Sequence, residues 1–480
     1  MLTISDFSYK YPDGTKALNN INLKINSGDF ILIAGPNGCG KSTLLKALLG
    51  DISEYTGCTI SGDIKLNGTS LKNEKIVNLA GKIGLVLQDP ESQISNLTVL
   101  EEVTFGTGNL LLTRDEMLLR AKAALKNVGL INLEDNSVLT LSGGQLQRLS
   151  IATITAMQPK VLILDEPLSN LDPLGISAVV NTIKVLNDSI EIVIITTHWL
   201  DPFLDLANRL ILMKQGRIVE DISTLNIENY IELLKSCNIE IPNKLNKVKI
   251  YHNVAEKTNI TICSLIKVSY AYSNGDKPLD SIDLELMEGS KTSLVGHNGA
   301  GKTTLTRLIA KLRSVKTGSI ISKIKKPAVV LQKPSLAFLT NSVFEEINFG
   351  SVLSPQDLKK LMEYLDLIEL QHKQPFQLSG GEQRRLALGI ALAINPDMLI
   401  MDEPSAGMDS LQLEHLINML EIFKGTTLCV THDHRMLGKV LPDILLLGQG
   451  RVLFHGSVKN LSKELYRYIG FTEDYYEYCL

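Results

Sequence analysis

The chain has 480 residues, of which 44% are hydrophobic and 21% are charged, and its formal net charge is −4. This length is too great for one ordinary core and suits two globular domains. The slightly acidic balance gives no basic signature for nucleic acid, so we expect no nucleic-acid partner. No apolar run approaches the roughly 18 residues that a membrane-spanning helix needs, so the sequence predicts no such helix.

Six cysteines are scattered along the chain, and no two have the C-x-x-C spacing of a zinc site or a redox dithiol. The first residues show no charged region followed by an apolar run, so we expect no signal peptide. Free thiols without a signal peptide favour the cytoplasm.

Two phosphate-binding sequences dominate the chain, Gly35-Pro36-Asn37-Gly38-Cys39-Gly40-Lys41-Ser42 and Gly296-His297-Asn298-Gly299-Ala300-Gly301-Lys302-Thr303. Short apolar runs precede them at 30–34 and 292–295, as expected of strands buried on both faces of a parallel sheet. Glycines let backbone N–H groups approach phosphate oxygens, and the following helix N-terminus favours negative charge. In such loops the lysine reaches the β- and γ-phosphates and the last hydroxyl reaches Mg²⁺.

A second shared motif is an apolar run that ends in Asp-Glu, at Asp165-Glu166 and at Asp402-Glu403. Each aspartate is expected at the carboxyl edge of the sheet, where it would hold Mg²⁺. Each following glutamate would polarise the attacking water as a general base. A single Asp-Glu-Pro is more often a helix start, but its repetition after a buried strand favours the catalytic interpretation.

Further paired features follow in the same order. The runs 192–196 and 427–431 end just before His198 and His432. A helix is also predicted earlier in each half. The first is indicated by the apolar face at 117–128, which Gly129 ends, and the second by a helix start at Ser354-Pro355. The chain therefore reads as a duplicated α/β protein with domains at 1–235 and 261–480 and a linker at 236–260. Around the join we expect a strand at 217–220, a helix at 227–237 and a turn at 241–244.

The order of motifs resembles that of the ATP-binding-cassette (ABC) ATPase family over almost all of both halves. Leu141-Ser142-Gly143-Gly144-Gln145 matches the family signature, and Leu378-Ser379-Gly380-Gly381-Glu382 matches it with Glu in place of the terminal Gln. The resemblance implies two tandem P-loop NTPase domains. Each would have a RecA-like mixed sheet core, an antiparallel β subdomain and a helical subdomain.

The resemblance also assigns roles to individual residues, with ATP and Mg²⁺ as cofactors. The catalytic residues would be Glu166, His198, Glu403 and His432. The nucleotide-binding residues of the first half would be Tyr11, Gly35, Asn37, Gly38, Gly40, Lys41, Ser42, Thr43, Gln88, Ser142, Gly143, Gly144 and Gln145. Those of the second half would be Tyr272, Gly296, Asn298, Gly299, Gly301, Lys302, Thr303, Thr304, Gln332, Ser379, Gly380, Gly381 and Glu382. The metal ligands would be Ser42, Gln88, Asp165, Thr303, Gln332 and Asp402.

The family pattern implies that the signature of one half caps the γ-phosphate of ATP held by the other half. Two composite sites would then form when the halves of one chain close. The segments 169–172 and 406–409 match the loop that couples the two sites. Because both halves keep every motif, we expect two hydrolysing sites. Tyr11 and Tyr272 match the adenine-stacking aromatic, with a core tyrosine as the alternative, and Trp199 is interpreted as packing.

One stretch resembles the energy-coupling-factor and cobalt-type importers, Gln88-Asp89-Pro90-Glu91-Ser92-Gln93 followed by Thr98–Gly106. In that group the stretch builds the groove for a membrane scaffold. The second half keeps Val343-Phe344-Glu345-Glu346 and Phe349-Gly350 but has Gln332-Lys333-Pro334 without a second glutamine. The alternative for this stretch is a surface helix whose paired acids are solvated.

The resemblance therefore implies an ATPase that energises import of a vitamin, a vitamin precursor or a metal ion. Its partners would be an integral membrane scaffold subunit and a small substrate-binding membrane subunit, and it would lie peripherally at the cytoplasmic face of the cell membrane. The alternatives are a tandem ATPase that acts on ribosomes and the ATPase of a sugar-type importer. The transported solute, the number of chains per complex and the role of the aromatic tail at 475–480 stay open.

Overall fold

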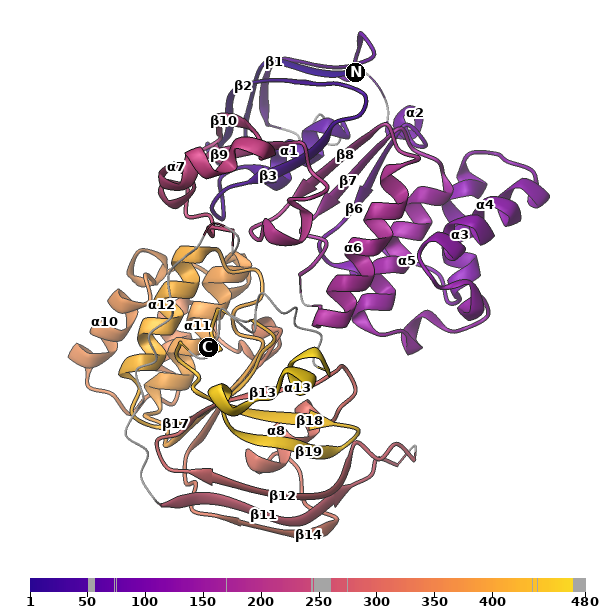
Figure 1. The fold of residues 1–480 in the computed structure, drawn as a ribbon. Coiled ribbons are helices and arrows are strands. Elements are labelled where there is room, and N and C mark those ends of the chain that lie inside the picture. The colour runs from indigo at the N-terminus through magenta and orange to yellow at the C-terminus, as the bar shows by residue number, and fades with distance from the viewer. Residues whose placement is uncertain are drawn as a thin grey trace. The chain divides into compact units, whose positions relative to one another are not determined.

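The computed structural model describes residues 1–50, 57–72, 74, 76–169, 171–242, 245, 260–273, 275–433, 435–437 and 439–468. The chain divides into two compact units, Met1–Lys247 and Val248–Leu480 (Figure 1). The domain limits 1–235 and 261–480 stay a prediction, and the tail at 475–480 lies outside the described residues.

The first unit contains two sheets. The smaller is antiparallel, with the order β2-β1-β4-β5. The larger has the order β10-β9-β3-β8-β7-β6, parallel except for the pairing of β10 with β9. The strands are β1 (Leu2–Lys10), β2 (Lys16–Ile25), β3 (Phe30–Ala34), β4 (Thr59–Leu66), β5 (Thr69–Ser70), β6 (Ile83–Val86), β7 (Val161–Asp165), β8 (Ile192–Thr196), β9 (Arg209–Lys214) and β10 (Arg217–Ser223).

Helices of the first unit lie on both faces of the large sheet. They are α1 (Lys41–Leu48), α2 (Ile76–Leu79), α3 (Val99–Asn109), α4 (Arg114–Asn127), α5 (Gly143–Ala156), α6 (Pro173–Asn187) and α7 (Ile231–Ser236). Alternate residues of β3 point into different cores. Phe30 and Leu32 pack with residues of α3 to α6, whereas Ile31 and Ile33 pack with α1 and the antiparallel sheet. The large sheet is therefore buried on both faces, which explains its continuous apolar runs.

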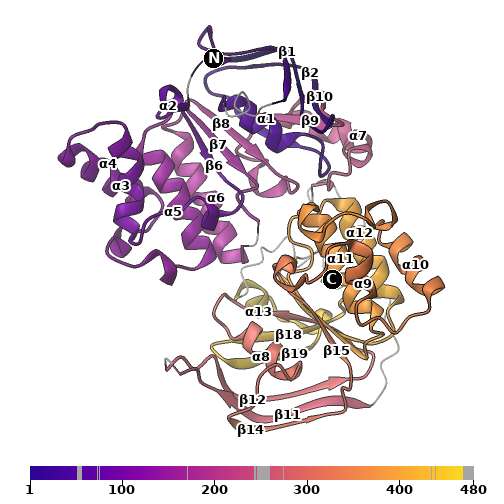
Figure 2. The same ribbon diagram turned by 180° about the vertical axis from the view of Figure 1, so that it is seen from behind.

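The second unit repeats this architecture (Figure 2). Its sheets have the orders β12-β11-β14 and β15-β16-β17-β13-β18-β19. The strands are β11 (Thr261–Tyr270), β12 (Leu279–Met287), β13 (Lys291–Val295), β14 (Thr317–Ser322), β15 (Pro327–Val330), β16 (Met398–Asp402), β17 (Thr426–Val430), β18 (Asp443–Gly448) and β19 (Arg451–Ser457). The helices are α8 (Lys302–Ile309), α9 (Val343–Asn348), α10 (Pro355–Tyr364), α11 (Gly380–Ala393), α12 (Ser410–Ile422) and α13 (Lys463–Tyr468). Among the described helices of both units, none has the length and apolar character required to cross a membrane.

The expected α/β fold with mixed core sheets, antiparallel subdomains and helical subdomains is confirmed. The six predicted strands before the loops, the aspartates and the histidines are β3, β7, β8, β13, β16 and β17. The predicted helices at 117–128 and after Ser354 are α4 and α10. Gly129 follows the C-cap of α4 with φ +68°, and Ser354 caps α10 through its side chain.

The segment after β10 differs from its prediction. A 3₁₀ helix spans Thr224–Tyr230, and the α-helix begins only at Ile231. The Thr224 hydroxyl donates to the Ala207 carbonyl at 2.5 Å, which holds the 3₁₀ segment against the large sheet. Cys237 and Ile239, which fall in the predicted linker, are buried in the core of the first unit. Residues 243 and 244 of the predicted turn at 241–244 lie outside the described residues.

The paired acids of α3 and α9 are not a solvated face. Glu102 is 2% exposed, and its Oε2 accepts from the backbone N–H groups of Ser95 and Asn96 at 3.0 and 2.9 Å. Glu346 is 3% exposed and accepts from the N–H groups of Leu339 and Thr340. The solvated interpretation is therefore wrong for the second acid of each pair, which holds the loop before its own helix.

We predict that Glu102→Gln lowers the free energy of unfolding of the first unit by about 2 kcal/mol. The substitution removes a charge that accepts several hydrogen bonds, and such bonds are worth about 1.5–3 kcal/mol. Urea unfolding followed by the fluorescence of Trp199, the single tryptophan, reports on this unit. Glu101→Gln is the matched control. Gln suits the third helical position that Glu101 fills in the capping box with Thr98, so a change within about 0.5 kcal/mol is expected. Equal effects of the two variants would contradict the prediction.

Candidate active sites

Each phosphate-binding loop lies hard against a neighbouring strand. A Cβ atom on Gly35 would stand 2.2 Å from the carbonyl oxygen of Met213 in β9, and one on Gly296 would stand 2.2 Å from that of Leu447 in β18. Only glycine permits this approach. The loops therefore connect β3 to α1 and β13 to α8 in a fixed position, with backbone N–H groups at two helix N-termini.

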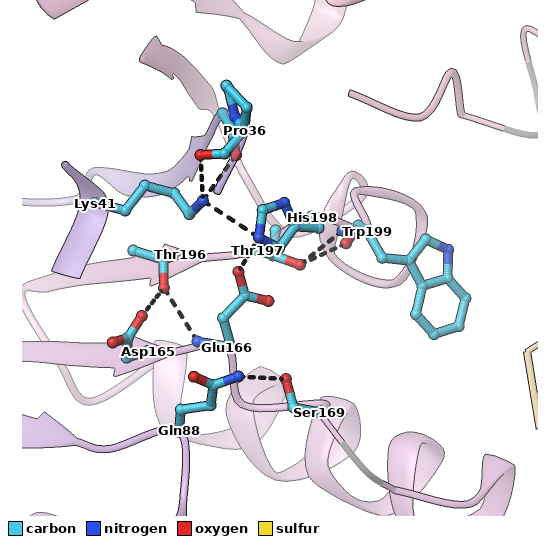
Figure 3. Close-up of polar contacts among 11 residues, drawn as sticks. Pro36, Lys41, Gln88, Asp165, Glu166, Ser169, Thr196, Thr197, His198 and Trp199 are labelled. Atoms are coloured by element: carbon cyan, nitrogen blue, oxygen red, sulfur yellow. Dashed lines mark hydrogen bonds and ion pairs between the residues drawn. The ribbon is translucent and has the colours of Figure 1, made fainter. Parts of the chain in front are cut away.

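The loop lysines are buried and turn back onto their own loops. Lys41 is 7% exposed, and its Nζ donates to the carbonyl of Gly35 at 2.7 Å and to that of Pro36 at 3.3 Å (Figure 3). Lys302 makes the same two bonds, to the carbonyls of Gly296 and His297. Incoming phosphate oxygens would replace these carbonyls as acceptors for a positive charge that is already in place.

Two carboxylates lie at the carboxyl end of each central strand. Asp165 and Asp402 are the last residues of β7 and β16. Glu166 and Glu403 come next, and both have φ +46°, a left-handed conformation that is rare for residues other than glycine. The shared backbone strain at two predicted catalytic positions fits a site whose geometry is constrained by function.

A histidine lies against each glutamate. His198 Nε2 is 3.1 Å from Glu166 Oε1 and 3.3 Å from Lys41 Nζ (Figure 3). In the second unit, the distance from His432 Nε2 to Glu403 Oε1 is 3.7 Å. The structure thus brings the predicted lysine, glutamate and histidine of the first unit into one cluster, and it pairs the last two in the second unit.

Burial controls the protonation of the glutamates. It raises the pKa of Glu166 to about 7, with a further rise from Asp165 that Lys41 opposes. It raises the pKa of Glu403 to about 8, where Asp402 adds to the effect and Lys302 opposes it. A base with a pKa near the working pH is well suited to proton transfer. Burial also raises the pKa of Asp402.

The oxygen donors at the loops fit Mg²⁺ bound together with phosphates. Ser42 and Thr303 are exposed in the first turns of α1 and α8. Among the described residues, no three His, Cys, Asp or Glu side chains form a cage that would hold a metal without a ligand. Mg²⁺ ordinarily uses one or two protein oxygens, water and substrate phosphates, which matches this set. Gln88 is exposed, with its Nε2 3.5 Å from Ser169 Oγ, and Gln332 is exposed.

The signature residues form helix starts. Ser142 and Ser379 are the N-caps of α5 and α11, and both are exposed. Gln145 and Glu382 turn back to accept from the N–H of their own serine, at 2.8 and 2.7 Å. Either side chain fills this position of the capping box, so Glu in place of Gln keeps the cap in the second signature. Gly143 and Gly380 have open space where a Cβ would lie, so the helix starts are accessible.

The predicted adenine-stacking tyrosines contact the loop helices. The Tyr11 hydroxyl is 3.1 Å from Thr43 Oγ1, and the Tyr272 hydroxyl is 2.8 Å from Thr304 Oγ1. The tyrosines two residues earlier, Tyr9 and Tyr270, are the buried core residues. Tyr11 and Tyr272 are partly buried beside the loops and also pack against the core clusters, so the adenine-stacking role stays a prediction.

Two features of the sites were not predicted from the sequence. The first is the hydrogen bond from the hydroxyl of Thr196 to Asp165 in the first unit. In the sequence, its only sign is a polar residue in an apolar run. Arg148 and Arg385 donate to the carbonyls of Val128 and Leu365, at the ends of α4 and α10. Equal spacing of these arginines after the two signature serines was the available signal. Trp199 is partly buried, and Figure 3 shows its ring pointing away from Lys41.

We predict that Glu166→Gln stabilises the nucleotide-free first unit at pH 7.5 by up to about 3 kcal/mol. Between the ordinary pKa of 4.5 and the folded value of about 7, the folded state holds a proton that the unfolded state has lost. Stability contributed by this proton is therefore complete below pH 4.5 and is lost as the pH rises to about 7. Glutamine has no proton to lose, so the variant should match the wild type near pH 4.5 and exceed it above pH 7.

The measurement is urea unfolding in EDTA at several pH values, followed by Trp199 fluorescence. The exposed Glu91 provides the control variant Glu91→Gln, which should keep the wild-type profile. A wild-type pH profile in Glu166→Gln would show that Glu166 is not held protonated by burial.

The comparisons with known proteins agree with this geometry. The family described as "ABC transporter" matches residues 18–169 and 279–406. A "Putative ABC transporter ATP-binding protein" of Methanosarcina acetivorans is 32% identical, over 94% of this chain and 84% of its own length. The "Putative ABC transporter ATP-binding protein TTE1589" of Caldanaerobacter subterraneus is 30% identical, over 95% of this chain and 91% of its own length.

Among solved structures, the chain is similar to the archaeal ribosome recycling factor aABCE1, solved in complex with the ribosomal stalk protein aP1. The TM-score is 0.66 with 21% identity, over 97% of this chain and 92% of that chain. At this identity the similarity shows the fold alone, a tandem arrangement of two cassettes.

Proposed function

Because this chain belongs to the ABC transporter family as an ATPase with two ATP-binding cassettes, we propose that it energises a membrane importer of the energy-coupling-factor type. The cargo would be a vitamin, a vitamin precursor or a metal ion. In this proposal the chain binds peripherally, at the cytoplasmic face, to a membrane scaffold subunit that works with a small substrate-binding subunit. One observation carries the importer proposal: matched apolar side chains are exposed beside the loop that follows each glutamine.

The first apolar patch consists of Leu97 and Leu139, which are 74% and 89% exposed. The segments that carry them are adjacent, because the N–H of Val138, the neighbour of Leu139, donates to the Leu97 carbonyl at 2.9 Å. The second apolar patch consists of Leu339 and Phe376, 76% and 61% exposed. Phe376 packs edge-on against Phe338, the neighbour of Leu339, with ring centroids 6.0 Å apart.

The patches are equivalent features of the two cassettes. Leu139 and Phe376 each lie three residues before the signature serine of their cassette. The buried Glu102 and Glu346 fix the loops that carry Leu97 and Leu339. Large apolar side chains that are exposed on rigidly held loops mark surfaces for a protein partner. Two equivalent surfaces suit a scaffold that contacts both cassettes.

The residues of each site support an assignment of roles in hydrolysis. Lys41 and Lys302 would exchange their loop carbonyls for the β- and γ-phosphate oxygens of ATP. Glu166 and Glu403 would accept the proton of the attacking water, and His198 and His432 would contact the γ-phosphate. Ser42, Gln88 and Asp165, and in the second cassette Thr303, Gln332 and Asp402, would hold Mg²⁺. The ion would neutralise charge on the phosphates.

The signature helices complete the proposal. Ser142 and Ser379 present a hydroxyl and helix N-terminal N–H groups, which suit a γ-phosphate. We assign each of them to ATP held by the other cassette of the same chain, so that ATP binding favours closure and hydrolysis favours release. Closure and release would move the two apolar patches, and this movement would act on the membrane scaffold.

We predict that Glu166→Gln and Glu403→Gln each lower ATP turnover by half or more while ATP binding is kept. The loss of a general base typically costs about 10²–10⁴-fold at the altered site. Phosphate release and equilibrium ATP binding measure the two quantities, with Glu101→Gln as the control that keeps both. If one glutamate variant left turnover unchanged, its site would not hydrolyse ATP.

We predict that the double variant Leu139→Asp, Phe376→Asp no longer copurifies with a hydrophobic scaffold chain from detergent extract, while its ATPase activity in solution is kept. Buried charges without partners weaken such an interface strongly. Leu225→Asp, a change of an 88% exposed leucine outside both patches, is the control and should copurify normally.

A second candidate function is action on ribosomes, because the described fold matches a ribosome recycling factor over nearly its whole length. The short linker that the sequence predicts at 236–260 and the paired apolar patches favour the importer. Sedimentation with ribosomes, together with no recovery in the membrane fraction, would overturn the importer proposal and leave the ATPase activity unaffected.

A further inference from the structure

A buried position between the central strands carries a different residue in each cassette. Asp165 pairs in parallel register with Thr196, the last residue of β8, and Asp402 pairs in the same way with Val430 of β17. Thr196 and Val430 are therefore equivalent, 0% and 1% exposed. One carries a hydroxyl where the other carries a methyl group.

The hydroxyl of Thr196 connects the two carboxylate residues of the first site. It donates to Asp165 Oδ1 at 2.5 Å and accepts from the backbone N–H of Glu166 at 3.1 Å (Figure 3). Its single donor is thus used, as is one of its two acceptor lone pairs. Asp165 is held in one orientation by a charge-assisted hydrogen bond of the strong kind.

The second cassette shows which of these two bonds matters. The N–H of Glu166 also donates to the Thr196 carbonyl at 3.1 Å, and the N–H of Glu403 makes the equivalent bond to the Val430 carbonyl at 2.8 Å. Glu403 has the same φ of +46° as Glu166 without a hydroxyl beside it. The left-handed conformation of the glutamate therefore does not need a hydroxyl. The specific effect of Thr196 is on Asp165, because Val430 has no hydroxyl with which to orient Asp402.

We propose that Thr196 is a positioning residue that orients Asp165 toward the divalent cation, so that the first site binds this cation more tightly than the second. The hydroxyl of Thr196 occupies Oδ1 and restricts rotation of the carboxylate, so Oδ2 is the oxygen that would contact the cation. Partners behind a metal ligand typically change metal affinity by about 10–100-fold. This inference rests on the metal site of the proposed function.

The test uses Mn²⁺ as the probe and needs no catalysis. The chain with Glu166→Gln and Glu403→Gln is loaded with ATP and titrated with Mn²⁺, and free Mn²⁺ is measured by electron paramagnetic resonance. We expect two classes of site per chain, about 10-fold apart in affinity. Adding Thr196→Val should weaken the tighter class by about 10-fold, and Thr196→Ser, which keeps the hydroxyl, should preserve it.

The reciprocal variant makes the test independent of the folding of Thr196→Val. Val430→Thr should tighten the weaker class toward the affinity of the other. A single class of sites with one affinity in the parent chain would overturn the role of Thr196. So would a weaker class whose affinity is unchanged by Val430→Thr. A loss of thermal stability in Thr196→Val without a change in Mn²⁺ affinity would show that the bond is only structural. An ATP-loaded chain that takes up no Mn²⁺ would instead contradict the proposed metal site itself.

Discussion

The close contact between each phosphate-binding loop and the strand beside it is the constraint on which both sites depend. Gly35 and Gly296 have no Cβ, so the loop backbone can lie directly against β9 and β18. This contact fixes the loop at the carboxyl edge of the parallel sheet, where the ends of β7 and β8 also lie. In open parallel sheets ligands bind at this edge. The lysine, the carboxylates and the histidine meet there because the topology brings these strand ends together.

Burial and the nearby charges then determine the protonation of the glutamate in each site. A lysine, an aspartate, a glutamate and a histidine share a buried region, and the lysine offsets only part of the cost of burying two carboxylates. The glutamates therefore keep a proton more readily than they would in water. Bound phosphates and a divalent cation would change this balance of charges. The protonation of each glutamate would therefore depend on whether ATP and the cation are bound.

The duplicated cassettes share their architecture but not every detail. The distance from histidine to glutamate is 3.1 Å in the first and 3.7 Å in the second. Thr196 faces Asp165, whereas Val430 faces Asp402. Two copies that retain the same motifs can therefore differ in the residues that support them.

The fold could largely be predicted from the sequence, because apolar runs and glycine loops are local signals. The same holds for the glutamate and histidine that the structure brings together in each unit. The register between β7 and β8 is not local, so the bond from Thr196 to Asp165 could not be foreseen. The burial of Glu102 and Glu346 depends on loops that wrap around a carboxylate, and sequence alone shows only a pair of acids. The helix at 227–237 was wrong in its first half because a tertiary bond from Thr224 favours a 3₁₀ turn.

The central claim is that both cassettes are complete ATP sites. Equilibrium dialysis of the chain carrying Glu166→Gln and Glu403→Gln against ATP with excess Mg²⁺ tests it most directly. The account predicts two ATP molecules per chain, one lost with Lys41→Ala and the other with Lys302→Ala. One ATP per chain, or a lysine variant that leaves the stoichiometry at two, would contradict it.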